Sequence, residues 1–499
     1  MVNLGLGFWG IAFFLLINAA DGSIHEYKNE GFTKIANLRY FHGGYEVLYA
    51  SEFLDVHASS PLEGKSFIRF DDISFVRSKE SANKQNSTQP TSGLVEAILF
   101  EQKQKYRVGG SLFKAEDMCC TPKLADAGSC NLGELLITAD PNDPQWPKRI
   151  PTFFTKGEEE VKMSPEAVAI TKTGFYTLYF MTCDPELDAT KIRGRTVWKN
   201  PYGYLPGDDV PFTTLFASMF WAYVLLALAW FPVFVQHWKH RIQLHSHITL
   251  VIVFAMCESA FRYVEFTNVN STGMRNMSDT FWAVTFSSLR MTLSRLLLLF
   301  ISSGYGVVKP VVGAMPWRML LLGVICFVLN EAIGCAEHLG VFSQQGMTFI
   351  RLSWSIVEMV FLQWIFRSLW KTLKMLKQVK TNTAKLQFYR MFAIALVFLM
   401  SVNITFIQVK FLVLDNPLSE FWWIMPACWY VLAYALLLLI CLFWAPSDKP
   451  TRYLYIAGMV EEFEKEDTNN NVERDEMSVL EAFLIMFGNL QEERHRNAY

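Results

Sequence analysis

The chain has 499 residues, of which 52% are hydrophobic and 18% are charged. Soluble chains carry about 25% charged residues, so this composition favours a membrane protein. The 41 Phe and 15 Trp residues are typical of membrane cores and interfacial belts. The formal net charge of −2 gives no indication of nucleic-acid binding, and we expect no nucleic-acid partner.

Residues 1–22 have the pattern of a secretory signal peptide. Leu4 to Ile17 is an apolar stretch, and small residues follow it at Ala19, Ala20 and Gly22. A short apolar core followed by small residues is typical of a cleaved signal. The segment lacks the usual Lys or Arg before the apolar stretch, and a short membrane anchor is the alternative.

Residues 23–205 are predicted to form one luminal β-sandwich domain. Three segments are rich in β-branched and aromatic residues: Ser66 to Val76, Gly93 to Phe100, and Gly174 to Cys183. The third is apolar on both faces, which is typical of a strand at the centre of a sheet. Asp140 to Pro151 is expected to be a turn-rich break. Ser78 to Ser92 is expected to be a polar loop that presents the glycosylation sequon of Asn86.

Four cysteines precede the first membrane span: Cys119, Cys120, Cys130 and Cys183. An even number in an oxidising lumen predicts two disulfides. Adjacent cysteines rarely pair because the bridge is strained, so Cys119 and Cys120 should each pair with Cys130 or Cys183. The alternative is a zinc site made of all four thiolates, although the usual CxxC spacing is missing.

Residues 206–445 contain seven apolar stretches, and residues 446–499 form a tail. The stretches lie at about 211–235, 246–264, 281–303, 319–338, 347–369, 391–412 and 421–444. Each has about 19 to 25 residues, which is enough to cross a hydrocarbon core of about 30 Å. We therefore predict a bundle of seven transmembrane helices.

Basic residues in the loops predict the orientation of this bundle. The loops after spans one, three and five are basic: Lys239, Arg241, Lys309, Arg318, Lys371, Lys374, Lys377, Lys380, Lys385 and Arg390. In the loops after spans two, four and six, the only basic residue is Arg275. The first set should face the cytosol, which makes the β domain luminal and the tail cytosolic. The sequons of Asn270 and Asn276 are then luminal, and we expect both to be glycosylated.

Ionisable side chains inside the spans form the candidate site. They are Glu258, Arg262, Glu265, Arg290, Glu331, Glu337, Arg351, Glu358 and Lys410. Each needs a partner, water or a function, because a charge in hydrocarbon is costly. Glu258, Arg262 and Glu265 share one face of the second span. We expect a hydrated cavity that opens toward the luminal domain; the alternative is a set of salt bridges that only holds the helices in register.

Motifs of enzymes are missing from the chain. It has no HExxH, P-loop or GxSxG sequence, so we expect neither an enzyme nor a cofactor. Glu337 and His338 are an isolated pair, and we expect no metal site there. Span three ends in Ser303-Gly304-Tyr305-Gly306, which is unlike the acidic-Arg-aromatic triplet of rhodopsin-type receptors.

Several segments resemble the lung seven-transmembrane receptor family, also described as Golgi-dynamics-domain seven-helix proteins with Wntless-like relatives. They are Ser288 to Gly313, Trp364 to Arg390, and Arg262 to Phe266. The resemblance implies a luminal β-sandwich above seven helices in Golgi membranes, and a role in trafficking that includes endosome-to-Golgi return. It also implies a cavity occupied by a lipid.

Three functional hypotheses follow. The first is a Golgi trafficking protein that binds a membrane lipid, such as a phospholipid, or a lipidated cargo. The second is a receptor that couples to a G protein through the basic segment from Lys371 to Arg390. The third is a cation channel or mechanosensor component lined by glutamates of spans two and four, which lacks a selectivity-filter pattern.

Overall fold

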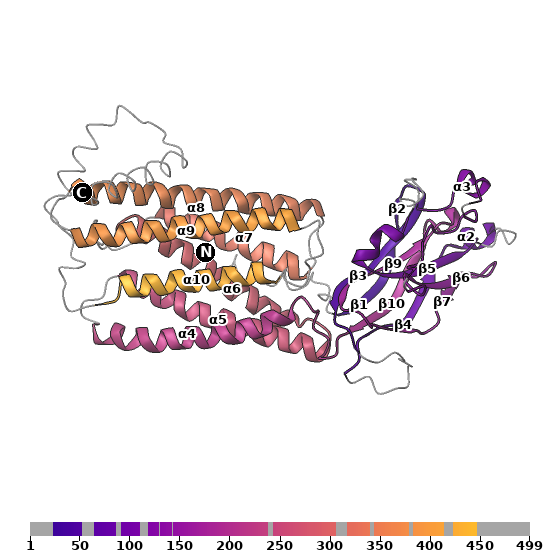
Figure 1. The fold of residues 1–499 in the computed structure, drawn as a ribbon, viewed down its shortest axis with the longest axis horizontal. Helices are drawn as coiled ribbons and strands as arrows, with labels where there is room; N and C mark the ends of the chain where they lie inside the picture. Colours follow the sequence, from indigo (N-terminus) through magenta and orange to yellow (C-terminus); the bar gives the residue numbers. More distant parts are fainter. Residues whose placement is uncertain are drawn as a thin grey trace, which may run out of the picture.

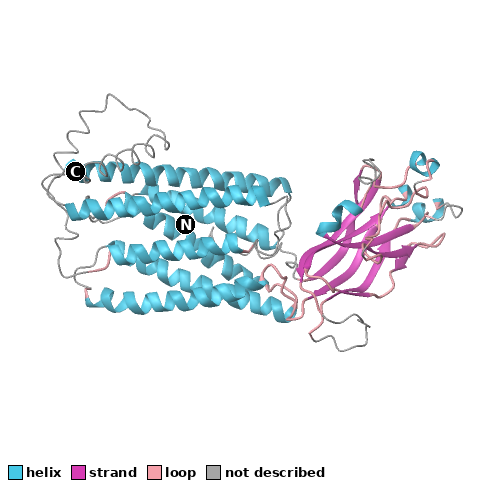
Figure 2. Ribbon diagram, in the orientation of Figure 1, coloured by secondary structure: helices cyan, strands magenta, loops and turns pink. Residues whose placement is uncertain are grey.

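The computed structural model describes residues 23–51, 64–85, 91–109, 118–128, 130–141, 143–237, 243–305, 317–339, 344–378, 383–413 and 423–446. A β domain lies at one end of a bundle of long helices (Figures 1 and 2). The predicted signal peptide, the sequon of Asn86 and the tail from residue 447 lie outside the described residues. So do the side chains of Glu337 and Lys410.

Strands of the β domain form two five-stranded sheets within the described residues. The first has the order β1-β10-β4-β7, with β8 also paired to β4: β1 (Ile24–Gly31), β10 (Lys191–Lys199), β4 (Phe67–Val76), β7 (Glu160–Lys162) and β8 (Ala167–Ala169). The second has the order β2-β3-β9-β5-β6: β2 (Thr33–Ile35), β3 (Leu38–Leu48), β9 (Gly174–Thr182), β5 (Leu94–Glu101) and β6 (Lys148–Phe153). All pairs are antiparallel.

The three predicted strands are confirmed as β4, β5 and β9, and β9 lies at the centre of its sheet. Its neighbours cover it on both edges, and its side chains enter a core that includes Phe180 and the fully buried Trp198 of β10. Apolar side chains from both sheets meet in this core, which is the architecture of a sandwich.

Two local predictions were wrong. The expected loop from Ser78 contains a short helix, α2 (Lys79–Lys84), because the Ser78 hydroxyl accepts a hydrogen bond from the backbone N–H of Ser81 and caps it. The expected break from Asp140 ends earlier than predicted, because β6 begins at Lys148 and pairs with β5. The other short helices are η1 (Gln102–Arg107), α3 (Pro122–Asp126) and η3 (Pro185–Leu187).

Two disulfides resolve the cysteine pairing. Cys119 is bonded to Cys183, and Cys120 to Cys130. The pairing fastens the segment around Cys119 onto the outer face of the second sheet, where Leu135 and Met181 pack against it. The alternative of a four-thiolate zinc site is therefore wrong, because all four sulfurs are in disulfides.

Long helices of the described residues occupy the seven predicted spans. They are α4 (Val210–Gln236), α5 (Gln243–Thr272), α6 (Met277–Ser302), α7 (Trp317–Leu339), α8 (Gln344–Gln378), α9 (Thr383–Val413) and α10 (Ile424–Phe443). Six are long and apolar enough to cross a membrane, and α9 contributes a shorter apolar stretch, Leu386–Val402. A core of buried apolar side chains, including Trp230, Phe361 and Phe392, joins these helices.

Hydrogen bonds between Asn270 and residues 202–205 join the β domain to the bundle, and we call them the clasp. At the end of α5, the Asn270 carbonyl accepts a hydrogen bond from the N–H of Tyr204 (3.0 Å), and its side-chain oxygen accepts one from Leu205 (3.1 Å). The Asn270 amide donates to the carbonyl of Tyr202 (3.2 Å). Gly203 allows this approach, because a Cβ there would lie 2.3 Å from the Asn270 side-chain oxygen. The β-domain end of the bundle is thus held at a defined position.

Candidate functional site

Charged side chains of α5 face the interior of the bundle, as their spacing predicts. Glu258, Arg262 and Glu265 are 2%, 8% and 1% exposed. Glu258 accepts hydrogen bonds from the guanidinium of Arg290 on α6, which also lies 5.7 Å from the ring centre of Tyr430 on α10. A single helix face therefore contributes to a polar layer between α5, α6 and α10.

A chain of ion pairs continues from this layer to the β domain. Arg262 Nη1 lies 3.0 Å from Glu265 Oε2, and Glu265 Oε1 lies 3.1 Å from Arg275 Nη1. Arg275 Nη2 lies 3.2 Å from Asp209 Oδ2, at the residue that precedes α4. We call Arg262, Glu265, Arg275 and Asp209 the ion chain. Its alternating signs compensate the burial of each charge.

Sequence reasoning missed two members of the ion chain. Arg275 was noticed only as a single basic residue in an otherwise uncharged set of loops, and Asp209 was not considered. Both lie outside the apolar spans, and folding of the α5–α6 turn brings Arg275 back over the end of α5. The available signals were the acidic pair Asp208-Asp209 before span one and the lone basic residue in the loop after span two.

Asp208, next to the ion chain, has a strongly perturbed acidity. Burial, with the charge of Asp209 as a second cause, raises the pKa of Asp208 to about 7. Its Oδ1 is buried and has no hydrogen-bond partner among the described residues. Burial also raises the pKa of Glu46 on β3, against the lowering effect of the bonded His25. The junction between the domains therefore holds carboxyl groups that protonate more easily than usual.

Glu331 on α7 lies beside these charges but is bonded differently. Its Oε1 accepts a hydrogen bond from the Thr285 hydroxyl of α6 at 2.9 Å. Its Oε2 is buried and has no donor within hydrogen-bond distance among the described residues, although the Ser288 hydroxyl of α6 also faces this carboxylate. A buried acceptor without a donor is uncommon in proteins, and a bound ligand or water is one explanation for it.

Glu358 is a predicted residue that lies in a second group of polar side chains. Glu358 of α8 pairs with Arg295 of α6 at 2.7 Å, in a separate cluster with Trp354 and Asn330. The structure thus places Glu358, a predicted cavity residue, in an ion pair between α6 and α8. Arg351 is exposed on α8. We call Arg295, Glu358, Trp354 and Asn330 the Arg295 cluster.

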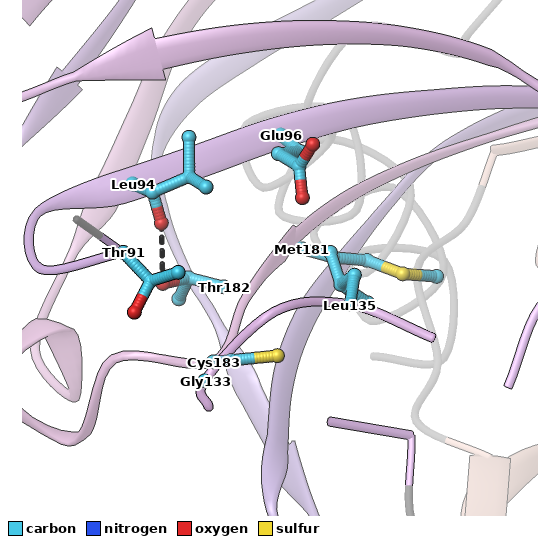
Figure 3. Close-up of a pocket in the computed structure, with 8 residues that line it drawn as sticks. All are labelled: Thr91, Leu94, Glu96, Gly133, Leu135, Met181, Thr182 and Cys183. Atoms are coloured by element: carbon cyan, nitrogen blue, oxygen red, sulfur yellow. Dashed lines mark hydrogen bonds between the residues drawn. The ribbon is translucent and has the colours of Figure 1, made fainter. Parts of the chain in front are cut away.

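The pocket in Figure 3 is not a ligand site. It lies in the β domain between β5, β9 and the segment around Leu135, and it is too tight to hold a water molecule. Thr182 closes it by donating a hydrogen bond from its hydroxyl to the Leu94 carbonyl, at 2.7 Å. Its lining residues stabilise the sheet beside the Cys119–Cys183 disulfide.

Comparison with known proteins places the bundle in a family. Residues 211–451, which contain α5 to α10 and all but the first residue of α4, match the "GOST, seven transmembrane domain" family. The seven-helix region of the chain thus matches this family of seven-helix membrane proteins, which is the one that the segment from Ser288 to Gly313 resembles.

Relatives extend the similarity beyond the bundle. Transmembrane protein 87A of Xenopus tropicalis is 32% identical over 263 residues, which are 52% of this chain and 48% of the relative. Transmembrane protein 87B of Mus musculus is 28% identical over 299 residues, 59% of this chain and 54% of the relative. Membrane protein PTM1 of Saccharomyces cerevisiae (strain YJM789) is 25% identical over 354 residues, 66% of each chain. The chain thus spans about half the length of the first two relatives.

Proposed function

We propose that this protein acts in membrane trafficking in the Golgi, including endosome-to-Golgi return, and that it binds a lipid or a lipidated cargo. The binding site is formed by the inward face of α5 together with Glu331. The orientation is β domain in the lumen and tail in the cytosol. Support for the Golgi role comes from the family resemblance, and support for lipid binding comes from the arrangement of charges.

The buried oxygen of Glu331 is the observation that carries the lipid proposal. Helix geometry places Glu331 about 12 Å from the β-domain end of α7, and Arg262 about 15 Å from the same end of α5. A phospholipid headgroup has a phosphate, which suits an arginine fork, and in many lipids an amine, which suits a carboxylate. Both kinds of partner therefore lie at a similar depth below the luminal surface, and a phosphate would share Arg262 with its ion-pair partner Glu265.

A rescue experiment in depleted cells tests the trafficking role. Cells that lack the protein should return an endosomal cargo to the Golgi more slowly, and the wild-type chain should restore the rate. Glu265→Gln should reach the Golgi but fail to restore it. Glu358→Gln, which removes a carboxylate from the Arg295 cluster, is the matched control and should restore it. Equal rescue by both variants would contradict a role for the α5 face.

One further observation favours the receptor hypothesis as a second candidate. Four basic residues of α8 are exposed along one face at its far end: Arg367, Lys371, Lys374 and Lys377. A cytosolic partner such as a G protein could contact this face. If it does, Lys374→Gln with Lys377→Gln should abolish nucleotide exchange in a purified G protein, which the lipid proposal does not require. The channel hypothesis has less support, because Glu258 and Glu265 are each paired with arginine.

A further inference from the structure

The outward face of the sheet formed by β1, β10 and β4 is strongly basic. Lys191, Arg193 and Arg195 of β10 are exposed on the outward face, while Ile192, Thr196 and Trp198 are buried on the inner face. Val197, which the alternation also places outward, is buried. Cross-strand register places six basic and two acidic residues on the outward face: Lys28, Arg69, Lys191, Arg193, Arg195 and Lys199, with Glu26 and Asp71. Three adjacent strands therefore present one array of cations.

Two β-bulges, one in β1 and one in β4, lie on either side of Arg193 of β10. The register of β1 shifts between Lys28 and Glu30, and the register of β4 shifts opposite Arg193 and Arg195. Asn29 (φ 60°) and Asp72 (φ 51°) have left-handed backbones, which are costly for residues other than glycine. Between them, Gly194 has φ 121°, and a Cβ there would lie 2.5 Å from the Asp72 carbonyl oxygen. Paired bulges are conformationally costly, and such features are frequent beside functional surfaces.

The charges on this face are incompletely compensated. Asp71 is shared by Arg69 (2.8 Å) and Arg195 (3.4 Å), and Glu26 pairs with Lys28 (3.2 Å). Lys191, Arg193 and Lys199 form no ion pair within the part of the chain that the structure describes.

Repulsion between two cations also destabilises this face. Lys28 and Arg193 are directly opposite each other across β1 and β10. Like charges in that position destabilise a sheet, so an anionic partner would relieve the repulsion.

The shape and composition of the face restrict the partner. Side chains on it are spaced by about 6.6 Å along each strand and about 4.8 Å between strands, which suits a polymer with many charges. None of the large hydrophobic side chains exposed in the described residues belongs to β1, β4 or β10. A peptide partner would lack the apolar anchor that protein interfaces usually need. We propose that this face binds a sulfated polysaccharide, whose sulfates would pair with Arg193, Arg195 and the lysines beside them.

Heparin is the probe that tests this proposal. The purified full chain in detergent micelles should bind heparin at about 0.15 M salt, and affinity should fall as salt rises. The triple variant Lys191→Gln, Arg193→Gln, Arg195→Gln should bind at least about tenfold more weakly. The control variant Lys103→Gln, Lys105→Gln, Lys123→Gln removes the same number of exposed charges elsewhere on the β domain, and it should bind like the wild type.

A footprint on the wild-type chain makes the test independent of variant folding. Bound heparin should protect Lys28 and Lys191 from acetylation, while Lys103 and Lys105 stay reactive. The proposal is overturned by no binding at 0.15 M salt, by equal losses in the two triple variants, or by uniform protection. Tighter binding to polyglutamate than to heparin would assign the face to an acidic polypeptide and would also overturn it. None of these readouts depends on trafficking activity or on lipid.

Discussion

Asp208 provides a test at the scale of single residues. Its pKa is raised from 3.8 to about 7, so the folded protein binds a proton more tightly than the unfolded chain does. Stability from this group is therefore greatest at acidic pH and is lost as pH rises from about 4 to about 7. We expect the wild-type melting temperature to fall by a few degrees between pH 5.5 and 8.

Asp208→Asn should remove most of this dependence, because the amide does not titrate. The measurement is the melting temperature of both proteins across that pH range, with Glu30→Gln at an exposed position as the control. Parallel curves for the wild type and Asp208→Asn would contradict the raised pKa.

Asn270 leads to a revised expectation about glycosylation. Both ends of its side-chain amide are used in the clasp to Tyr202 and Leu205, and Gly203 lies against it. A glycan on that nitrogen keeps one N–H but needs space that Gly203 and Tyr202 occupy, so we expect folded protein to have no glycan at Asn270. Asn276 also uses both ends of its amide, since its Oδ1 caps α6 and its Nδ2 donates to Asp279 at 3.2 Å, but it is exposed, and it stays a predicted glycosylation site. Glycopeptide mass spectrometry decides this, and near-complete occupancy at Asn270 would show that the clasp does not form.

At the scale of elements, the two disulfides should differ in their effect on stability. The Cys119–Cys183 bridge spans 64 residues and Cys120–Cys130 spans 10. In the chain-entropy account, these bridges contribute roughly 4 and roughly 3 kcal/mol, because the longer loop loses more freedom. Cys183→Ser with Cys119→Ser should therefore cause more retention in the endoplasmic reticulum than Cys120→Ser with Cys130→Ser. Pulse-chase measurement of export would reveal the reverse order if the account is wrong.

The elements that sequence reasoning predicted are those with a strong local signal. The segments of β4, β5 and β9 are apolar and β-branched, and the long apolar helices exceed the length of a bilayer core. Strands β1 and β10 were missed, since their alternation places charged residues such as Lys28 and Arg193 on the outer face. The inward face of α5 could be predicted from spacing. Its partners could not, because they depend on how the α5–α6 turn folds and on how α6 packs against α5.

Topology is the first question at the scale of the whole molecule. Basic loops after the odd-numbered spans predict a luminal β domain and a cytosolic tail, and this orientation stays a prediction. Asn86 should be glycosylated, and protease added outside sealed Golgi vesicles should remove the tail but leave the β domain intact. A tail that survives the digestion would contradict the seven-span arrangement.

The central question for the whole molecule is whether the buried charges of α5 bind a ligand or only hold the helices together. Glu265 is bonded to both Arg262 and Arg275, so a purely structural role predicts a large loss of stability when its charge is removed. Breaking a buried ion pair typically costs about 3–5 kcal/mol. In a hydrated lipid site, water or the headgroup would instead solvate the two arginines.

Native mass spectrometry and thermal unfolding of the same preparation separate these cases most directly. The wild type should retain a lipid, and Glu265→Gln should melt within a few degrees of it but lose that lipid. Glu358→Gln in the Arg295 cluster should keep the lipid. A Glu265→Gln protein that is grossly unstable, or one that retains the lipid in full, would contradict the account.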